Sequence, residues 1–176
     1  MTAAMLLRAL VAYLKVAVSD YAAAQADGGR YTVPRVFDWY LPFKDPRKEE
    51  KIDFPYIVAR IMDGEDPERE PQDATGSTVH VHLSFGVYHP GTVDEAGFIH
   101  PDGNYDLLNL MEHVRMALQQ QPLLDQRYRL EKPYNWDIPD GQPYPLWVGQ
   151  AVTRWSVQSV TEQIQGVDLH GSQWTR

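Results

Sequence analysis

The residues best suited to chemistry in this sequence are two histidines that alternate along one stretch. His80 and His82 stand two residues apart, so on a strand both imidazoles lie on one face. Such a pair binds a transition metal when a third ligand joins it. His89, His100 and His113 are available, but none has a characteristic ligand spacing. We favour the simpler interpretation, in which His80 and His82 are polar residues on the outer face of a half-buried strand.

A second candidate resembles the start of a calcium-binding loop. Asp102, Asn104 and Asp106 alternate as such a loop requires. The loop also needs glycine at its sixth position and glutamate at its twelfth, where this sequence has Leu107 and His113. We therefore interpret the run as a turn followed by a helix, with Asn104 as the N-cap.

A cluster of carboxylates lies between two apolar segments. This acidic cluster consists of Asp63, Glu65, Asp66, Glu68 and Glu70. A hydrolase with paired carboxylates holds both groups in a cleft and raises the pKa of one of them. An acidic loop interrupted by proline does neither, so we expect a solvated or interface loop.

Other catalytic patterns are missing from the sequence. Ser84 lacks the glycine spacing of a nucleophile elbow. Gly28 and Gly29 follow the first predicted helix, whereas a phosphate-binding loop precedes a helix. We predict no catalytic, cofactor-binding or metal-binding residue, and no cofactor.

The elements that must position these residues follow from hydrophobic periodicity. Apolar residues at helical spacing predict helices over 2–25 and 105–120. Alternating or short apolar runs predict strands over 56–62, 78–88, 127–131 and 147–160. This order predicts an α+β domain in which an antiparallel sheet of about four strands carries two helices on one face, with long loops. We expect one domain over 1–160 and a C-terminal tail over 161–176.

The first predicted helix is apolar on two arcs. One arc faces the core, and the second, which includes Met5, Tyr13 and Val16, faces either the core or a neighbouring subunit. Tyr144 and Trp147 lie in a segment rich in proline and aromatic residues. Because Trp and Tyr are enriched at interface centres, we assign both to the core or to a subunit interface.

Composition narrows the function classes. The chain has 176 residues, which is one domain's worth, and it contains no cysteine. Disulfide scaffolds, thiol nucleophiles and thiolate metal sites are therefore excluded. The 24 acidic and 16 basic residues give a net charge of -8, which disfavours tight binding to duplex DNA. Arg8 and Lys15 interrupt the apolar N-terminal run, so we expect no signal peptide, no membrane span and a cytoplasmic origin.

Four segments between residues 55 and 157 resemble a known family when they are taken in order and spacing. They read PYIVARIMDGED from 55, DLLNLMEHVR from 106, YRLEKP from 128 with Trp136 after it, and QPYPLWVG from 142. In the last segment Leu146 replaces the family's usual aromatic residue. The family is that of the tail terminator, or tail completion, proteins of long-tailed double-stranded DNA phages.

The resemblance implies a structural role in the virion rather than an enzyme. Subunits of this family form a ring, usually a hexamer, on the last ring of the tail tube protein. The ring ends tube polymerisation and offers a surface to the head–tail connector or stopper protein, while DNA passes through its lumen without specific binding. The family folds are α+β with an antiparallel sheet. The implied location is the neck of the virion, after assembly from the host cytoplasm.

Within such a ring, we expect members of the acidic cluster to line or border the lumen, where they would repel DNA and let it slide. Two alternatives stay open at this point. One is another neck protein, such as a head-completion or stopper subunit. The other is a small enzyme with a metal bound at His80 and His82.

Overall fold

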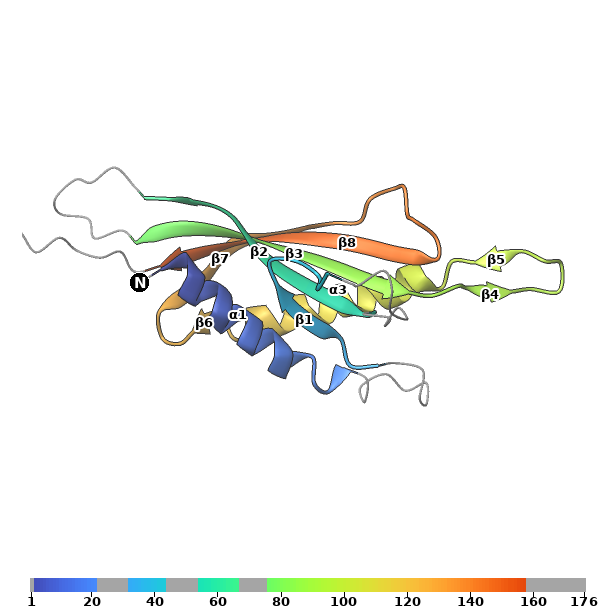
Figure 1. Ribbon diagram of the computed structural model, residues 1–176, viewed down its shortest axis with the longest axis horizontal. Helices are drawn as coiled ribbons and strands as arrows, with labels where there is room; N and C mark the ends of the chain where they lie inside the picture. The colour runs from blue at the N-terminus through green and yellow to red at the C-terminus, as the bar shows by residue number, and fades with distance from the viewer. Residues whose placement is uncertain (1, 22–31, 44–53, 67–75, 158–176) are drawn as a thin grey trace, which may run out of the picture.

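The computed structural model describes residues 2–21, 32–43, 54–66 and 76–157, and these form a long curved sheet with helices on one face (Figure 1). The helices are α1 (Ala3–Ala17) and α3 (Gly103–Gln120). The strands are β1 (Arg35–Asp38), β2 (Tyr56–Glu65), β3 (Ser77–Tyr88), β4 (Thr92–Val93), β5 (Ile99–His100), β6 (Leu123–Leu124), β7 (Tyr128–Asp137) and β8 (Leu146–Val157).

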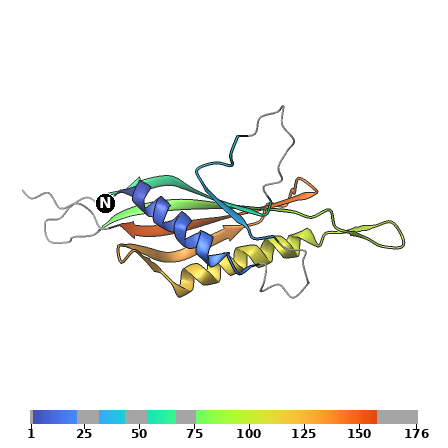
Figure 2. The same cartoon turned by 60° about the horizontal axis from the view of Figure 1, so that its bottom comes forward.

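Six of these strands form a mixed sheet in the order β1-β2-β3-β8-β7-β6. The strands β3 and β8 occupy the centre and pair antiparallel over their full lengths, with Leu83 opposite Ala151. At the edge, β1 runs parallel to β2. Both helices lie against the same face of the sheet, as a turned view shows (Figure 2).

The core lies between that face and the helices. On β3, every second residue from Val79 to Val87 is buried, and the same alternation runs along β8 from Trp147 to Val157. The helices contribute one buried face each, with Leu6, Leu10 and Leu14 from α1 and Leu107, Leu110, Val114 and Leu118 from α3. Each fully buried leucine contributes about 1.5–3 kcal/mol, so this one-sided layer is the main source of stability.

The strands β4 and β5 form a separate two-stranded hairpin. With its flanking residues 89–102 it makes a projection that we call the arm. The arm extends past the end of the main sheet and lies beyond both helices in two views (Figures 1 and 2).

The predicted α+β class is confirmed, but the sheet differs from the prediction. Instead of about four antiparallel strands, the described residues form a six-stranded mixed sheet. The two strands of this sheet that were not predicted are β1, with four residues, and β6, with two residues. Segments that short contain too few residues to show an alternating pattern, so hydrophobic periodicity does not predict them.

The helices begin and end at other residues than predicted. The first ends at Ala17 rather than near residue 25, and residues 22–31 lie outside the described part. The second begins at Gly103, and its N-cap is Asp102, not Asn104. The carboxylate of Asp102 makes no capping bond, because it accepts a hydrogen bond from the Thr92 hydroxyl instead (2.6 Å).

Two strands extend further than predicted. The strand β2 continues to Glu65, and β7 continues through Pro133 to Asp137. Pro133 is accommodated because it lies at a register shift between Glu131 and Asn135, where no ladder N–H is required. The predicted tail over 161–176 lies outside the described residues. No helix in the described ranges has the length and apolar character needed to span a bilayer.

Tyr134 on β7 is partly buried, and its hydroxyl oxygen is the one buried side-chain oxygen or nitrogen of the described residues that has no hydrogen-bond partner. Burial raises the pKa of its phenol above the usual value of 10.0. By contrast, the Tyr13 hydroxyl donates to the carbonyl oxygen of Ala117 (2.7 Å) and so joins α1 to α3. The two tyrosines therefore make a matched pair for testing the core.

We expect Tyr134→Phe to keep or raise the free energy of unfolding, by up to about 1 kcal/mol, because it removes an unpaired buried hydroxyl. Tyr13→Phe should lower it by about 1 kcal/mol.

Since the folded pKa of Tyr134 exceeds 10.0, the folded chain binds more protons than the unfolded chain above pH 10, and the free energy of unfolding falls as pH rises. That alkaline loss should shrink in Tyr134→Phe. Urea unfolding at neutral and alkaline pH measures both effects, and equal losses in the two variants would contradict the assignment.

Candidate functional site

The tip of the arm is held in one conformation by Asp94. One of its carboxylate oxygens accepts the backbone N–H groups of Ala96 (2.9 Å) and Phe98 (2.8 Å), and the other lies 3.2 Å from Nε2 of His100. Gly97 takes a φ of 86°, a left-handed value that glycine adopts without strain. The turn is thus preorganised, although the ladder behind it is only two residues long on each strand.

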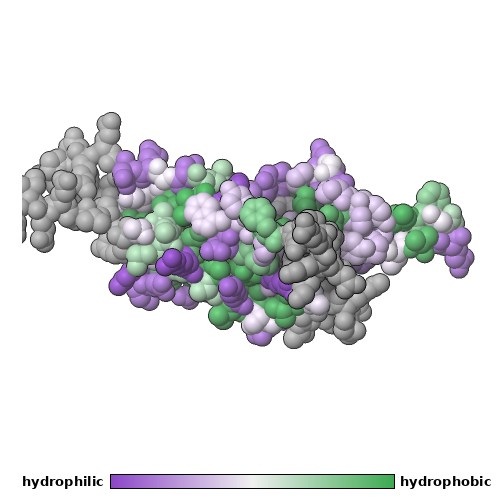
Figure 3. Space-filling view, viewed as in Figure 1, coloured by the Kyte–Doolittle hydropathy of each residue, from purple (hydrophilic) through white to green (hydrophobic). Residues whose placement is uncertain are grey.

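This fixed tip carries exposed apolar side chains. Phe98 is 70% exposed and Val93 is 67% exposed, and Ile99 beside them is half exposed. Figure 3 shows hydrophobic residues gathered on the arm, away from the main body of the molecule. Rigid, exposed aromatic and branched residues on a projection are the kind of surface that partners cover.

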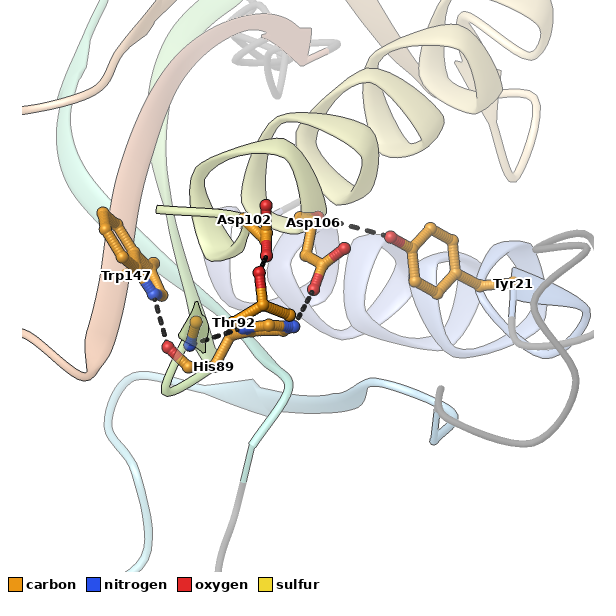
Figure 4. A network of polar contacts seen from close by, with 7 residues as sticks. Tyr21, His89, Thr92, Asp102, Asp106 and Trp147 are labelled. Atoms are coloured by element: carbon orange, nitrogen blue, oxygen red, sulfur yellow. Dashed lines mark hydrogen bonds and ion pairs between the residues drawn. The ribbon is translucent and has the colours of Figure 1, made fainter. Parts of the chain in front are cut away.

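The base of the arm is clamped to the domain by polar contacts (Figure 4). Nε1 of Trp147 donates to the carbonyl oxygen of His89 (2.9 Å), and the Tyr144 hydroxyl donates to the carbonyl oxygen of Pro90 (2.7 Å). The Thr92–Asp102 hydrogen bond closes the base from the other side. The arm therefore leaves the domain in a defined direction.

His89 and Asp106 form a polar pair at the same base. Nε2 of His89 lies 3.7 Å from the Asp106 carboxylate, and both side chains are largely buried. They border a cavity of about 200 Å³ with Tyr21 and Tyr88. Nδ1 of His89, however, accepts the N–H of Gly91 (2.9 Å). With both imidazole nitrogens facing groups of the chain, His89 has none directed at a substrate, so this pair anchors the arm.

The residues predicted for a subunit interface occupy different environments. Val16 is 71% exposed and Met5 is 47% exposed, and both lie on the outer face of α1. Tyr13 is half-buried against α3 through its bond to Ala117. Tyr144 is half exposed beside the arm, whereas Trp147 is buried below it. Their role in a subunit interface stays a prediction. Met5, Val16 and Tyr144 are exposed and so are accessible to a partner.

Three members of the acidic cluster lie at or just after the end of β2, at the end of the sheet opposite the arm (Figure 1). Asp63 is paired with Nδ1 of His80 (2.5 Å), Glu65 is exposed, and Asp66 accepts a hydrogen bond from the Ser77 hydroxyl. Glu68 and Glu70 lie outside the described residues. The placement of the cluster in a lumen stays a prediction.

His80 and His82 share the open face of β3, as the alternation predicted, but they have different partners. While His80 contacts Asp63, His82 lies 3.0 Å from Oε1 of Gln150, whose amide nitrogen donates to Asp137 (3.3 Å). This orientation makes Nε2 of His82 the protonated nitrogen. No group of three His, Asp or Glu side chains suited to a metal ion occurs within the described ranges.

Hydrophobic periodicity does not predict the arm, which falls between the predicted strand over 78–88 and the predicted helix over 105–120. The residue types of this segment nevertheless contain a signal for a hairpin. Asp94 and Gly97 bracket a tight turn, and the β-branched residues Thr92, Val93 and Ile99 flank it. The strands are only two residues long, too short for periodicity to distinguish them from a loop.

No protein-family model matches the chain, and no curated protein matches it.

The clamp at the base of the arm predicts a sharp contrast between two glycines. A Cβ at Gly103 would collide with the indole of Trp147, whereas one at Gly141 would meet nothing within 4 Å. We expect Gly103→Ala to cost about 1–3 kcal/mol of unfolding free energy through overpacking and to release the arm. Gly141→Ala should leave both unchanged. Thermal unfolding measures the first effect, and hydrogen exchange of the amides of Gly91 and Phe98 measures the second. Equal behaviour of the two variants would contradict the clamp.

Proposed function

We propose that this chain is a structural subunit of a phage tail terminator, which forms a ring at the end of the tail tube, ends tube polymerisation and joins the tail to the head–tail connector. The resemblance of residues 55–157 to that family suggests the role. The observation that carries the proposal is the apolar arm, held by hydrogen bonds at its tip and base, together with a second exposed apolar surface on α1.

Two different unpartnered surfaces suit a ring. A contact between unlike surfaces of identical subunits is heterologous, and it closes into a ring when the rotation between subunits permits. The arm and the outer face of α1 lie on separate parts of the molecule in both views (Figures 1 and 2). Each subunit thus offers one surface to each of two neighbours.

The sheet edges suit a component that stops polymerisation. On one edge, β1 is only four residues long. On the other edge, β6 is two residues long and pairs only with the start of β7. The rest of β7 has a register shift and Pro133, with the exposed Lys132 beside them. Short edge strands, bulges, prolines and lysines hinder the pairing of a further strand. Such edges suit a subunit that contacts its neighbours through surfaces other than the sheet edges, because strand pairing at an edge would add further subunits without limit.

The carboxylates at the end of β2 suit a channel that DNA crosses without binding. Asp63, Glu65 and Asp66 lie together at the end of the sheet away from the arm. Oriented toward the lumen of the proposed ring, they would repel the phosphate backbone and reduce adhesion.

The test is electron microscopy of the purified chain, alone and mixed with isolated tail tubes and with tube subunits during polymerisation. We expect rings that cap one end of each tube and a shorter mean tube length as more chain is added. Tubes capped at neither end and unchanged in length would contradict the terminator role.

The same experiment distinguishes the alternatives. Rings that ignore tubes but bind portal-bearing heads would identify a head-completion or stopper subunit instead. A monomer that binds neither, together with stoichiometric metal in the purified chain and its loss in His82→Ala, would favour an enzyme at His80 and His82. A matched His113→Ala variant, altered far from that face, controls for general destabilisation.

A further inference from the structure

The outer face of α1 carries a narrow apolar strip. Met5, Ala9, Ala12 and Val16 recur at intervals of four, three and four residues, so they follow one line along the helix. All but Ala9 are exposed, in contrast to the leucines on the opposite side of the helix. We call these four residues the outer strip. The small alanines at its centre leave room for a bulky side chain from a partner.

Charge distinguishes the surroundings of the outer strip from those of the arm. The helix α1 contains two cations, Arg8 and Lys15, and no acidic residue. Both cations are exposed on one side of the strip, and no ion-pair partner for either occurs among the described residues. The arm has the opposite character, with three carboxylates at Asp94, Glu95 and Asp102 and no lysine or arginine between residues 89 and 102.

The two surfaces therefore complement each other in both hydrophobicity and charge. Within one chain they lie far apart, since the arm projects beyond the end of the molecule away from α1 (Figures 1 and 2). A contact between them thus requires two copies. The turn bonds of Asp94 also keep Phe98 in an exposed position, which lowers the entropy cost of inserting it into a partner.

We propose that the arm of one copy packs across α1 of the next copy, with Phe98 on the outer strip and the arm's carboxylates beside Arg8 and Lys15. This inference deepens the proposed function, because the contact would be the one that builds the ring. Every subunit donates its arm and accepts another, so a closed ring leaves neither surface exposed.

A third group of exposed aromatic residues follows β1, and the test of the contact has to distinguish it from the outer strip. Trp39, Tyr40 and Phe43 follow β1, and Phe43 is 99% exposed. Trp39, Tyr40 and Phe43 carry no charge that would attract the carboxylates of the arm. The residues that follow them, 44–53, lie outside the described part. Phe43 is therefore a suitable site for a control variant with an equally accessible aromatic residue.

Disulfide trapping tests the contact directly, because the native chain contains no cysteine. Phe98→Cys is combined in one chain with Met5→Cys, Ala12→Cys or Val16→Cys, and each double variant is oxidised after assembly. The control combines Phe98→Cys with Phe43→Cys. The products are separated on a denaturing gel without reductant, and the linked peptides are identified by mass spectrometry.

We expect at least one of the three pairs to give a ladder of covalent multimers that ends at the mass of the ring. Each single variant should give dimers at most, and the control pair should give no ladder. No ladder from any of the three pairs, or an equal ladder from the control, would overturn the proposal. Rings that cap tubes but fail to link would sink this contact and leave the terminator role standing, whereas linked multimers that ignore tubes would do the reverse.

Charge reversal gives a second test. Glu95→Arg should weaken assembly about tenfold, and Arg8→Glu with Lys15→Glu should weaken it similarly. Placing all three changes in one chain should restore most of the loss, because the opposite charges face each other again. Asp140→Arg, at an exposed carboxylate outside the arm, should have little effect. Sedimentation over a range of concentrations measures the dissociation constant, and additive losses in the triple variant would overturn the pairing.

Discussion

The central strands β3 and β8 bury only one face, and the rest of the structure depends on this constraint. Their inward residues require a cover of apolar side chains, which α1 and α3 provide. That requirement fixes α3 across the sheet, with its first turn beside Trp147. The arm leaves the domain immediately before this turn, so the packing of the core also sets the direction of the arm. The outward residues, free of this demand, include polar groups such as His82 and Gln150, which are joined by a hydrogen bond across the strands.

The arm shows how a segment without a core of its own acquires a defined shape. Its two-residue strands would not persist as an isolated hairpin. Asp94 organises the tip, while Trp147, Tyr144 and His89 fix the base. His89 and Asp106 form a largely buried pair at this base, and the other imidazole nitrogen of His89 accepts the N–H of Gly91. The polar contacts of the arm therefore hold its exposed apolar side chains in a defined position.

The sequence predicted the parts of the fold that have long periodic patterns. The alternation over 78–88 and 147–160 identified β3 and β8, and with them the face on which His80 and His82 lie. The helical stripes identified α1 and α3 to within a few residues, apart from the end of α1. The short strands β1, β4, β5 and β6 were not predicted, because two to four residues carry no measurable period. Of the interface candidates, Met5 and Val16 proved exposed, whereas Trp147 proved to be buried beneath the arm.

By itself, the sequence determined the class of the domain, the inward and outward faces of its long elements, and the absence of thiol chemistry. These are local properties, since each depends on residue type and on spacing along the chain. Only the tertiary structure decided that β1 pairs parallel to β2 and that Asp102 bonds to Thr92 of the arm instead of capping the helix. It also decided that His80 pairs with Asp63 whereas His82 pairs with Gln150. Such choices depend on contacts between residues distant in sequence, and several partners compete for each polar group. Which partner each polar group has depends on the geometry of the whole fold, and hydrophobic periodicity along the chain does not predict it.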